Sequence, residues 1–167
     1  MRNKKVLFTV QAAAIAAIYV VLTVLGAAFS FGEVQVRIAE ALTILPCFTP
    51  AAIPGLFVGC LLGNFLGGAI PLDIVCGSLA TLAAAYCSYL LRKRKYLVPL
   101  PPVIANALVV PFVLYYGYGI NLPIPFMMLT VGAGEVLSCY VIGLIFLMVL
   151  DRYKNVIFNC SEPGRIL

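Results

Sequence analysis

Residues 33–46, "EVQVRIAEALTILP", decide how often this chain crosses a membrane, because they place Glu33, Arg37 and Glu40 inside an otherwise apolar sequence. The chain has 167 residues, of which 63% are hydrophobic and 10% charged, and its mean hydropathy is +1.10. These values differ strongly from those of soluble domains and indicate an all-α integral membrane protein. Since about 20 apolar residues span the hydrocarbon core, we expect residues 1–167 to form a single membrane domain of five or six helices, with no soluble domain.

Hydropathy favours six transmembrane helices. The first apolar run follows a basic start like that of a signal peptide, but it is longer than a signal-peptide core of about 7–15 residues, so we interpret it as a retained span. The second is the least typical span, because it is short and charged. The six predicted spans are residues 6–29, 34–48, 51–70, 74–91, 97–116 and 126–150.

The distribution of basic residues supports the second span. Lys and Arg cluster at residues 2–5, 92–95 and 151–154. With six spans all three clusters fall on one side of the membrane, whereas five spans would place the last cluster on the other side. The positive-inside rule then predicts cytoplasmic N and C termini in a multi-pass protein of the cell membrane. The loops predicted to be external contain no Lys or Arg and comprise residues 30–33, 71–73 and 117–125.

Several function classes are disfavoured by what the sequence lacks. The net charge of +5 comes from residues at the ends of apolar runs, so it reports topology and no nucleic-acid partner is expected. There is no histidine, no nucleotide-binding glycine loop, no serine-hydrolase elbow and no metalloprotease motif. The six cysteines lack C-x-x-C spacing and are interpreted as small apolar residues. We therefore expect no enzyme activity, no cofactor and no metal site.

Small residues recur at helix-packing distance in two of the spans. In the third, Gly55, Gly59, Gly63 and Gly67 repeat every four residues, which lets helix backbones approach closely. In the first, the same spacing is found for Ala12 with Ala16 and for Ala13 with Ala17. This alanine face packs either inside the bundle or against another protein.

Polar residues of five different spans converge at similar depth. From a rise of about 1.5 Å per residue, Glu40 and Asn64 lie about 9 Å below the external ends of their helices, Glu135 about 14 Å and Asn106 about 16 Å. Asp73 lies at the mouth of the fourth span. Ionisable residues inside a membrane are costly and usually face a cavity or a partner, so we expect a shared pocket open to the outside. Isolated hydrogen-bonded pairs are the alternative.

Two of these regions have further features. In a helix, residues 33, 37 and 40 share one face, so Arg37 is able to pair with either Glu33 or Glu40. A salt-bridged helix entrance without a ligand remains an alternative for Glu33 and Arg37. Glu135 follows two glycines that leave space beside it, and Ser138 lies on the same helix face. No Lys or Arg is predicted at the depth of Glu135.

Five motifs, in one order, resemble the queuosine-precursor transporter family, QueT, over most of residues 6–152. They are "VQVRIAEALTILP" (34–46), "GNFLGG" (63–68), "LDIVCGSLATL" (72–82), "PPVIANALVVP" (101–111) and "VGAGEVLSCYVIG" (131–143). The resemblance implies a six-helix substrate-binding (S) component of an energy-coupling factor (ECF) transporter, which captures a 7-deazaguanine such as preQ1 or queuine. It also implies three partner subunits, one transmembrane coupling protein and two ATP-binding-cassette ATPases. The stretch Ala12, Ala13, Ala16 and Ala17 matches the motif that contacts the coupling protein in this family.

The predicted polar residues suit such a substrate chemically. A carboxylate of Glu135 or Glu40 can accept hydrogen bonds from the guanine-like edge, and Asn64 or Asn106 can donate to its O6. Asp73 or the remaining glutamate would pair with a cationic aminomethyl group. Tyr115, Tyr116 or Phe112 would stack on the ring, unless they are interfacial belt residues. The full set of expected substrate-binding residues is Glu135, Glu40, Asn106, Asn64, Asp73, Arg37, Ser138, Tyr115 and Tyr116.

A second function stays open at this stage, namely a self-powered secondary carrier of a small cation or nucleobase. Such carriers usually contain internal repeats, and none is recognisable here. A binding subunit driven by a separate ATPase therefore fits better. The sequence does not distinguish preQ0, preQ1 and queuine, because these molecules share the ring edge and differ only in the substituent at C7.

Overall fold

The computed structural model describes residues 4–26 and 37–157, and all regular elements in these two ranges are helical. Four helical stretches are long and apolar enough to cross a membrane, and two shorter apolar helices accompany them. The all-helical membrane architecture expected from composition is thus confirmed. The long stretches are Lys4–Leu25, Pro71–Leu90, Lys95–Tyr116 and Ile124–Tyr153, and the short helices are Ile38–Cys47 and Ala52–Leu66.

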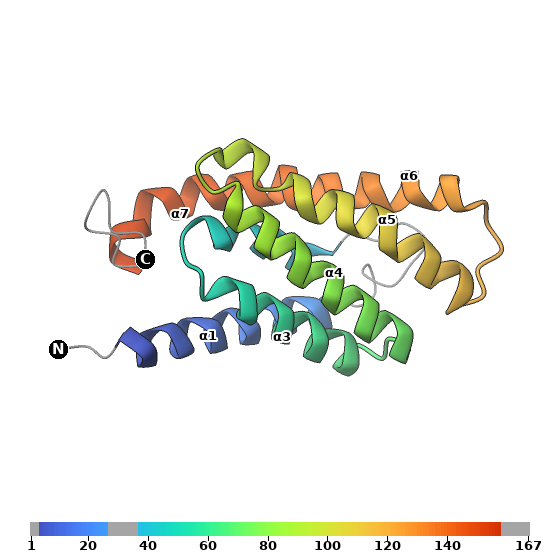
Figure 1. Ribbon diagram of the computed structural model, residues 1–167, viewed down its shortest axis with the longest axis horizontal. Coiled ribbons are helices and arrows are strands. Elements are labelled where there is room, and N and C mark those ends of the chain that lie inside the picture. The colour runs from blue at the N-terminus through green and yellow to red at the C-terminus, as the bar shows by residue number, and fades with distance from the viewer. Residues whose placement is uncertain (1–3, 27–36, 158–167) are drawn as a thin grey trace.

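The helices form a bundle in which neighbours in sequence are mostly neighbours in space (Figure 1). α1 (Lys4–Leu25) packs on α3 (Ala52–Leu66), α3 on α4 (Pro71–Leu90), and α4 on α5 (Leu100–Tyr116). A one-turn helix, η2 (Lys95–Leu97), precedes α5. The last span is built from α6 (Ile124–Glu135), η3 (Val136–Ile142) and α7 (Gly143–Ile157). α6 packs on α5 and completes the succession of helices.

The element at the centre of this bundle is η1 (Ile38–Cys47), which contacts α1, α3, α4, η3 and α7. It is a 3₁₀-helix, not the α-helix predicted for residues 34–48, of which residues 34–36 lie outside the described ranges. Its residues from Ala39 to Pro46 are all buried, and only the first residue, Ile38, is exposed, so η1 has no continuous lipid-facing side. At a rise of about 2.0 Å per residue its ten residues extend only about 20 Å, less than the hydrocarbon core. η1 is therefore an internal helix wrapped by the longer ones.

Glycines bring α1 and α3 into close contact. A Cβ built at Gly55 would lie 2.8 Å from the Ala12 carbonyl oxygen, and one built at Gly59 would lie 2.8 Å from the Tyr19 Cβ. At Gly63 the nearest atoms are those of the Thr23 side chain, 3.1 Å away. The four-residue glycine repeat of the sequence is thus the surface on which α1 lies, as helix association in lipid requires.

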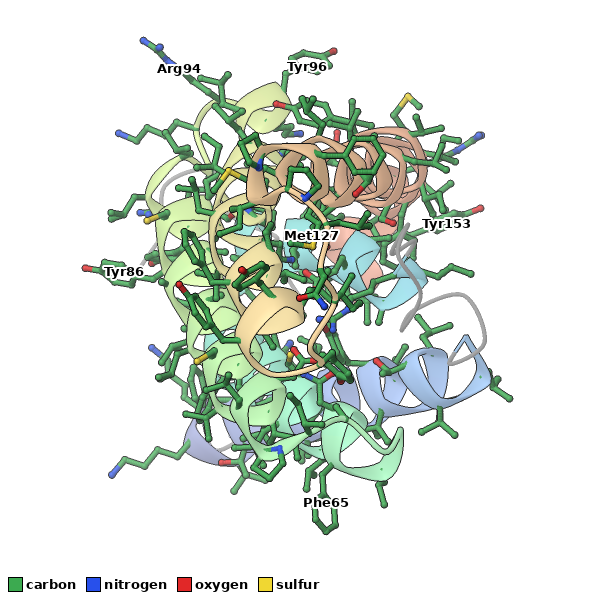
Figure 2. The ribbon with its side chains drawn as sticks, turned by 90° about the vertical axis from the view of Figure 1, so that its right-hand side faces the viewer. Phe65, Tyr86, Arg94, Tyr96, Met127 and Tyr153 are labelled. Carbon is green, nitrogen blue, oxygen red and sulfur yellow. The ribbon has the colours of Figure 1, made fainter. Side chains whose placement is uncertain are left out.

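The outer surface of the bundle is apolar. Side chains such as Phe65, Tyr86 and Tyr153 point away from the helices and are more than half exposed, whereas Met127 is buried between them (Figure 2). Large exposed apolar side chains cover the lipid-facing sides of a membrane protein, where no water needs to be excluded.

The basic clusters gather at one end of the bundle. The start of α1, the segment around η2 and the end of α7 all lie at the left of Figure 1, whereas the α3–α4 turn and the 117–123 loop lie at the right. Lys95 and Asp151 form an ion pair of 2.6 Å at the basic end. This arrangement agrees with the distribution of charge used above, and the cytoplasmic location of this end stays a prediction.

Candidate functional site

The buried polar site starts on η1. A 3₁₀-helix has three residues per turn, so Arg37, Glu40 and Thr43 follow one another along one side of it. Glu40 is 0% exposed, and its Oε1 accepts a hydrogen bond of 2.5 Å from the Tyr19 hydroxyl on α1. The Thr43 hydroxyl donates to the main-chain oxygen of Glu40 at 2.6 Å. The other carboxylate oxygen, Oε2 of Glu40, has no hydrogen-bond partner among the described residues.

The second buried glutamate, Glu135, ends α6 at the point where the helix widens into a π-helix, η3. Such π-turns are common at functional sites. Glu135 is 1% exposed, and its Oε1 accepts a hydrogen bond of 2.9 Å from the Asn106 amide on α5. The Cys139 thiol donates to Oε2 of Glu135 at 3.4 Å. Ser138, predicted to lie beside Glu135, donates to the Gly134 carbonyl oxygen at 3.0 Å.

The two glutamates meet across the helices. One carboxylate oxygen of Glu40, one of Glu135 and the Cys139 Sγ lie within 4.8 Å of one another. The same Sγ lies 3.6 Å from the Glu40 carbonyl oxygen and 3.7 Å from the Thr43 hydroxyl oxygen. Two carboxylates and a thiol can bind a metal ion or another cation. Sequence spacing did not indicate this cluster, because Glu40 and Cys139 are 99 residues apart.

Asp73 anchors a second group of polar residues near the α3–α4 turn. Arg37 Nη2 lies 3.6 Å from Oδ2 of Asp73, and both side chains are buried. Of the two partners predicted for Arg37, Glu40 forms no ion pair with it in the described structure and Glu33 lies outside the described ranges; the ion pair with Asp73 was not predicted. Oδ1 of Asp73 is buried and has no hydrogen-bond partner in the described part of the chain.

Tyr118, in the loop between α5 and α6, closes this second group. Its hydroxyl donates to Oδ2 of Asp73 at 3.1 Å and accepts from the Ile70 amide at 3.4 Å. Partial burial, followed by the negative charge of Asp73, raises the pKa of Tyr118 above its ordinary value. The phenol therefore remains a hydrogen-bond donor at neutral pH.

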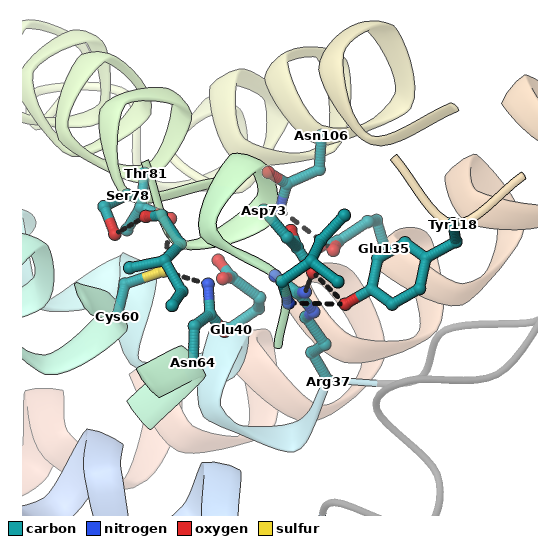
Figure 3. A network of polar contacts seen from close by, with 12 residues as sticks. Arg37, Glu40, Cys60, Asn64, Asp73, Ser78, Thr81, Asn106, Tyr118 and Glu135 are labelled. Atoms are coloured by element: carbon teal, nitrogen blue, oxygen red, sulfur yellow. Dashed lines mark hydrogen bonds and ion pairs between the residues drawn. The ribbon is translucent and has the colours of Figure 1, made fainter. Parts of the chain in front are cut away.

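Asn64 on α3 lies between these groups and a third set of contacts (Figure 3). Its amide donates to the Cys60 Sγ at 3.6 Å, and the Thr81 hydroxyl donates to the same sulfur at 3.4 Å. A Cβ built at Gly77 would lie 3.2 Å from Asn64 Nδ2 and 3.3 Å from Asp73 Oδ1. Gly77 thus provides the space in which Asn64 and Asp73 approach each other.

Two of the predicted residues do not join this network. Tyr115 and Tyr116 stack edge to face on each other, with ring centroids 5.0 Å apart, at the end of α5. They are 38% and 72% exposed, and Phe112 is exposed as well. Their position corresponds to the alternative of an aromatic belt.

The predicted alanine face is divided by the structure. Ala16 is buried against α3, where its Cα would lie 3.1 Å from a Cβ at Gly59, and Ala12 is half-buried beside Gly55. Ala13 and Ala17 are exposed on the outer side of α1. Of the four alanines predicted to contact a coupling protein, only these two are available on the surface of the described structure.

Sequence reasoning did not select three residues that contact the site carboxylates, namely Tyr19, Tyr118 and Cys139. Tyr19 and Cys139 lie inside apolar runs, where a phenol or thiol usually serves as packing. Cys139 follows Glu135 by four residues, about one helical turn, and this spacing alone indicates that the two side chains lie on one helix face. Nothing in the sequence connects Tyr19 with Glu40.

Comparisons with known proteins agree with the resemblance found in the sequence. The family model described as "QueT transporter" matches residues 9–152. A protein of Lactococcus lactis subsp. cremoris (strain MG1363) described as "Queuosine precursor transporter QueT" is 33% identical to the chain over 96 residues. That alignment covers 56% of the chain and 56% of the relative, a little over half of each. No solved structure matches the chain.

The family match extends from within the first helix into the last one and includes every residue of the buried polar network. Four helical stretches of the described chain are long and apolar enough to cross a membrane, and the network joins residues of these stretches to residues of the two shorter apolar helices. The chain is a multi-pass membrane protein that belongs to the QueT transporter family.

Proposed function

We propose that the chain is the substrate-capture S component of an ECF-type importer and binds a queuosine precursor, a 7-deazaguanine, from outside the cell. Membership of a family of transporters supports a transport role without enzyme activity. The proposal rests on one observation: Glu40 and Glu135 are both buried, and one carboxylate oxygen of each lies within 4.8 Å of the other and of Cys139 Sγ. A ligand rich in N–H donors requires buried carboxylates whose acceptor oxygens are not all used by the protein itself, as is the case for Oε2 of Glu40.

The chemistry of a 7-deazaguanine fits this group. Its pyrimidine edge presents N1–H and N2–H donors, which a carboxylate can accept side by side. Oδ1 of Asp73 and Oε2 of Glu40 are buried acceptors without a partner among the described residues. Asn64, near Asp73, can donate to O6 of the ring. The proposed binding residues are Glu135, Glu40, Asn106, Asn64, Asp73, Arg37 and Ser138, with Tyr19, Cys139 and Tyr118 as supporting contacts.

The proposed partners are a transmembrane coupling protein and two ATP-binding-cassette ATPases, which would supply the energy. The exposed pair Ala13 and Ala17 offers a surface on which a partner helix can approach closely. We place the basic end of the bundle at the cytoplasmic side, so that the 117–123 loop and the α3–α4 turn face outward, near Asp73 and Tyr118.

The first experiment is direct. The full chain is purified in detergent, examined by mass spectrometry for a co-purifying 7-deazaguanine, and titrated by calorimetry with preQ1 and queuine. We expect one of them to bind with sub-micromolar affinity. Absence of binding to a folded protein would contradict the proposal, and so would uptake by the chain alone into vesicles under an ion gradient, which would indicate a self-powered carrier.

Substitution of Glu135 tests the site. Glu135→Gln keeps the shape but replaces an acceptor oxygen with an amide donor, which should cost about 1–3 kcal/mol of binding free energy, or roughly 10- to 100-fold in affinity. Asp151→Asn makes the same chemical change at the basic end, where the side chain is 35% exposed, and should leave affinity unchanged. Undiminished affinity of Glu135→Gln would remove Glu135 from the binding site.

A further inference from the structure

The charges of the buried network are not balanced. Among the residues that the structure describes, it contains three carboxyl groups, of Glu40, Asp73 and Glu135, and one guanidinium, of Arg37. Arg37 forms an ion pair with Asp73, and neither glutamate forms an ion pair with another described residue. Two carboxylates that share an apolar interior repel each other and are costly to desolvate, so their environment favours a cation between them.

The neutral donors around the glutamates hold them in a defined orientation. The Tyr19 hydroxyl binds Oε1 of Glu40 at 2.5 Å, and the Asn106 amide binds Oε1 of Glu135 at 2.9 Å. These contacts fix one oxygen of each carboxylate and add no positive charge. Oε2 of Glu40 has no partner in the described structure, and Oε2 of Glu135 receives only the weak thiol donor of Cys139 at 3.4 Å. Outer hydrogen bonds of this kind also orient the carboxylate ligands of metal ions.

We propose that Glu40 and Glu135, with Cys139 beside them, form a subsite for a protonated amine, and that the site thereby selects 7-deazaguanines whose C7 substituent carries a positive charge. This inference rests on the proposed function. An ammonium group offers three N–H donors and one charge, which match Oε2 of Glu40, without a described partner, and Oε2 of Glu135, which receives only the thiol. A neutral nitrile at C7 offers no donor and directs its own negative end toward these oxygens. The ring edge is then left to Oδ1 of Asp73, which is buried without a described partner.

A metal ion is another source of positive charge for the same three residues. It would require the Cys139 thiol to ionise and so to add a third negative charge in the interior. The thiol instead lies in donor contact with Glu135 Oε2 and with the Glu40 carbonyl oxygen, at 3.4 and 3.6 Å. These contacts correspond to a protonated thiol, which favours the ammonium.

The test compares two ligands with the same ring, 7-aminomethyl-7-deazaguanine (preQ1) and 7-cyano-7-deazaguanine (preQ0), by calorimetry with the full purified chain. The ammonium of preQ1 donates charge-assisted hydrogen bonds to the two carboxylates, whereas the nitrile of preQ0 places a hydrogen-bond acceptor against them. The amine should therefore bind at least about 100-fold more tightly. Glu40→Gln should reduce this preference at least about tenfold, because it removes one charge and leaves the ring contacts. Asp151→Asn is the matched control and should keep the preference.

Each outcome has a distinct meaning. Equal affinity of the folded protein for both ligands overturns the subsite and leaves the proposed function in place, and so does binding of queuine alone, whereas binding of none of the three overturns the proposed function itself. If Glu40→Gln does not fold, Glu135→Gln makes the same charge change on the opposite side of the subsite, and an unchanged preference there also overturns the inference.

Elemental analysis of the purified chain and Cys139→Ser separate the two sources of charge. With an ammonium occupant, Cys139→Ser keeps the preference for the amine, because serine supplies a comparable neutral group. A stoichiometric metal ion in the protein, together with loss of the preference after chelation or in Cys139→Ser, would overturn the proposal in favour of a metal site.

Discussion

Gly77 is the residue whose lack of a side chain shapes the site most directly. A Cβ there would lie 3.2 Å from Asn64 Nδ2 and 3.3 Å from Asp73 Oδ1, so Gly77→Ala must displace one or both polar groups. We expect a loss of about tenfold or more in affinity for the 7-deazaguanine, the effect of one misplaced buried hydrogen bond. Calorimetry measures this loss, and the melting temperature should change little, because the displaced atoms are the ends of side chains.

Gly132→Ala is the matched control for this substitution. Its Cβ would lie 3.6 Å from the Ala107 Cβ, an ordinary van der Waals distance, although Gly132 also belongs to the segment before Glu135. Affinity should therefore be retained in this variant. An equal loss in both variants would mean that binding responds to general disturbance of the helices and not to the position of Asn64 and Asp73.

For single residues, the sequence indicates which charged side chains belong to the site, but not which side chains contact them. Glu40 and Glu135 can be selected from the sequence because an ionisable group inside an apolar run is costly, and Asp73 because it lies at the mouth of the neighbouring span. For Arg37 the sequence predicts a pair with Glu33 or Glu40; its ion pair with Asp73, 36 residues further on, is not predicted, and Glu33 lies outside the described ranges. Tyr19 and Cys139 were not selected, since their role depends on contacts with Glu40 across 21 and 99 residues.

Among the elements, η1 and η3 differ from the helices that hydropathy predicts. An apolar run indicates burial, but it does not determine whether a turn contains three, 3.6 or more than four residues. In η1 the shorter turn aligns Arg37, Glu40 and Thr43 along one side. In η3 the wider turn follows Glu135 directly. Both departures occur beside the buried glutamates, where packing among several helices decides the local geometry.

The contact between α1 and α3 can be tested through Gly59. A Cβ at this position would lie 2.8 Å from the Tyr19 Cβ and 3.1 Å from the Ala16 Cα, atoms that move only with the backbone of α1. We expect Gly59→Ala to destabilise the protein by about 1–3 kcal/mol, as overpacking does, and to lower the melting temperature followed by circular dichroism in detergent. Val58→Ala, on the exposed side of α3, should have little effect. Equal stability of Gly59→Ala and the parent would contradict the close packing.

For the whole molecule, the outer face of α1 is predicted to join the chain to its coupling protein. Replacing both Ala13 and Ala17 with leucine fills the surface on which a partner helix would lie. We expect the double variant to bind its ligand normally but to lose co-purification with the coupling protein and ATPases, and hence uptake. Val21→Leu on the same helix is the control. Normal assembly of the double variant would show that the complex forms elsewhere.

Membrane orientation is the second property of the whole molecule that can be measured. In a background without Cys87 and Cys160, Asn121→Cys should react with a membrane-impermeant maleimide in intact cells. Lys93→Cys should react only after the membrane is permeabilised, because the basic end is predicted to be cytoplasmic. The opposite pattern of labelling would reverse the orientation and place Asp73 and Tyr118 at the inner side.

The close contact of α1 with α3 also has a mechanical consequence. At Gly55, Gly59 and Gly63 the backbone and Cβ atoms of α1 lie directly against α3, and such close packing transmits a displacement with little compression, so α1 responds as a stiff lever. One side of this lever carries Tyr19, which holds Glu40, and two residues earlier the other side carries Ala17, exposed to the membrane. A displacement of Glu40 by an incoming ligand would thus be transmitted through Tyr19 to the outside of α1, where a neighbouring protein could distinguish a loaded carrier from an empty one.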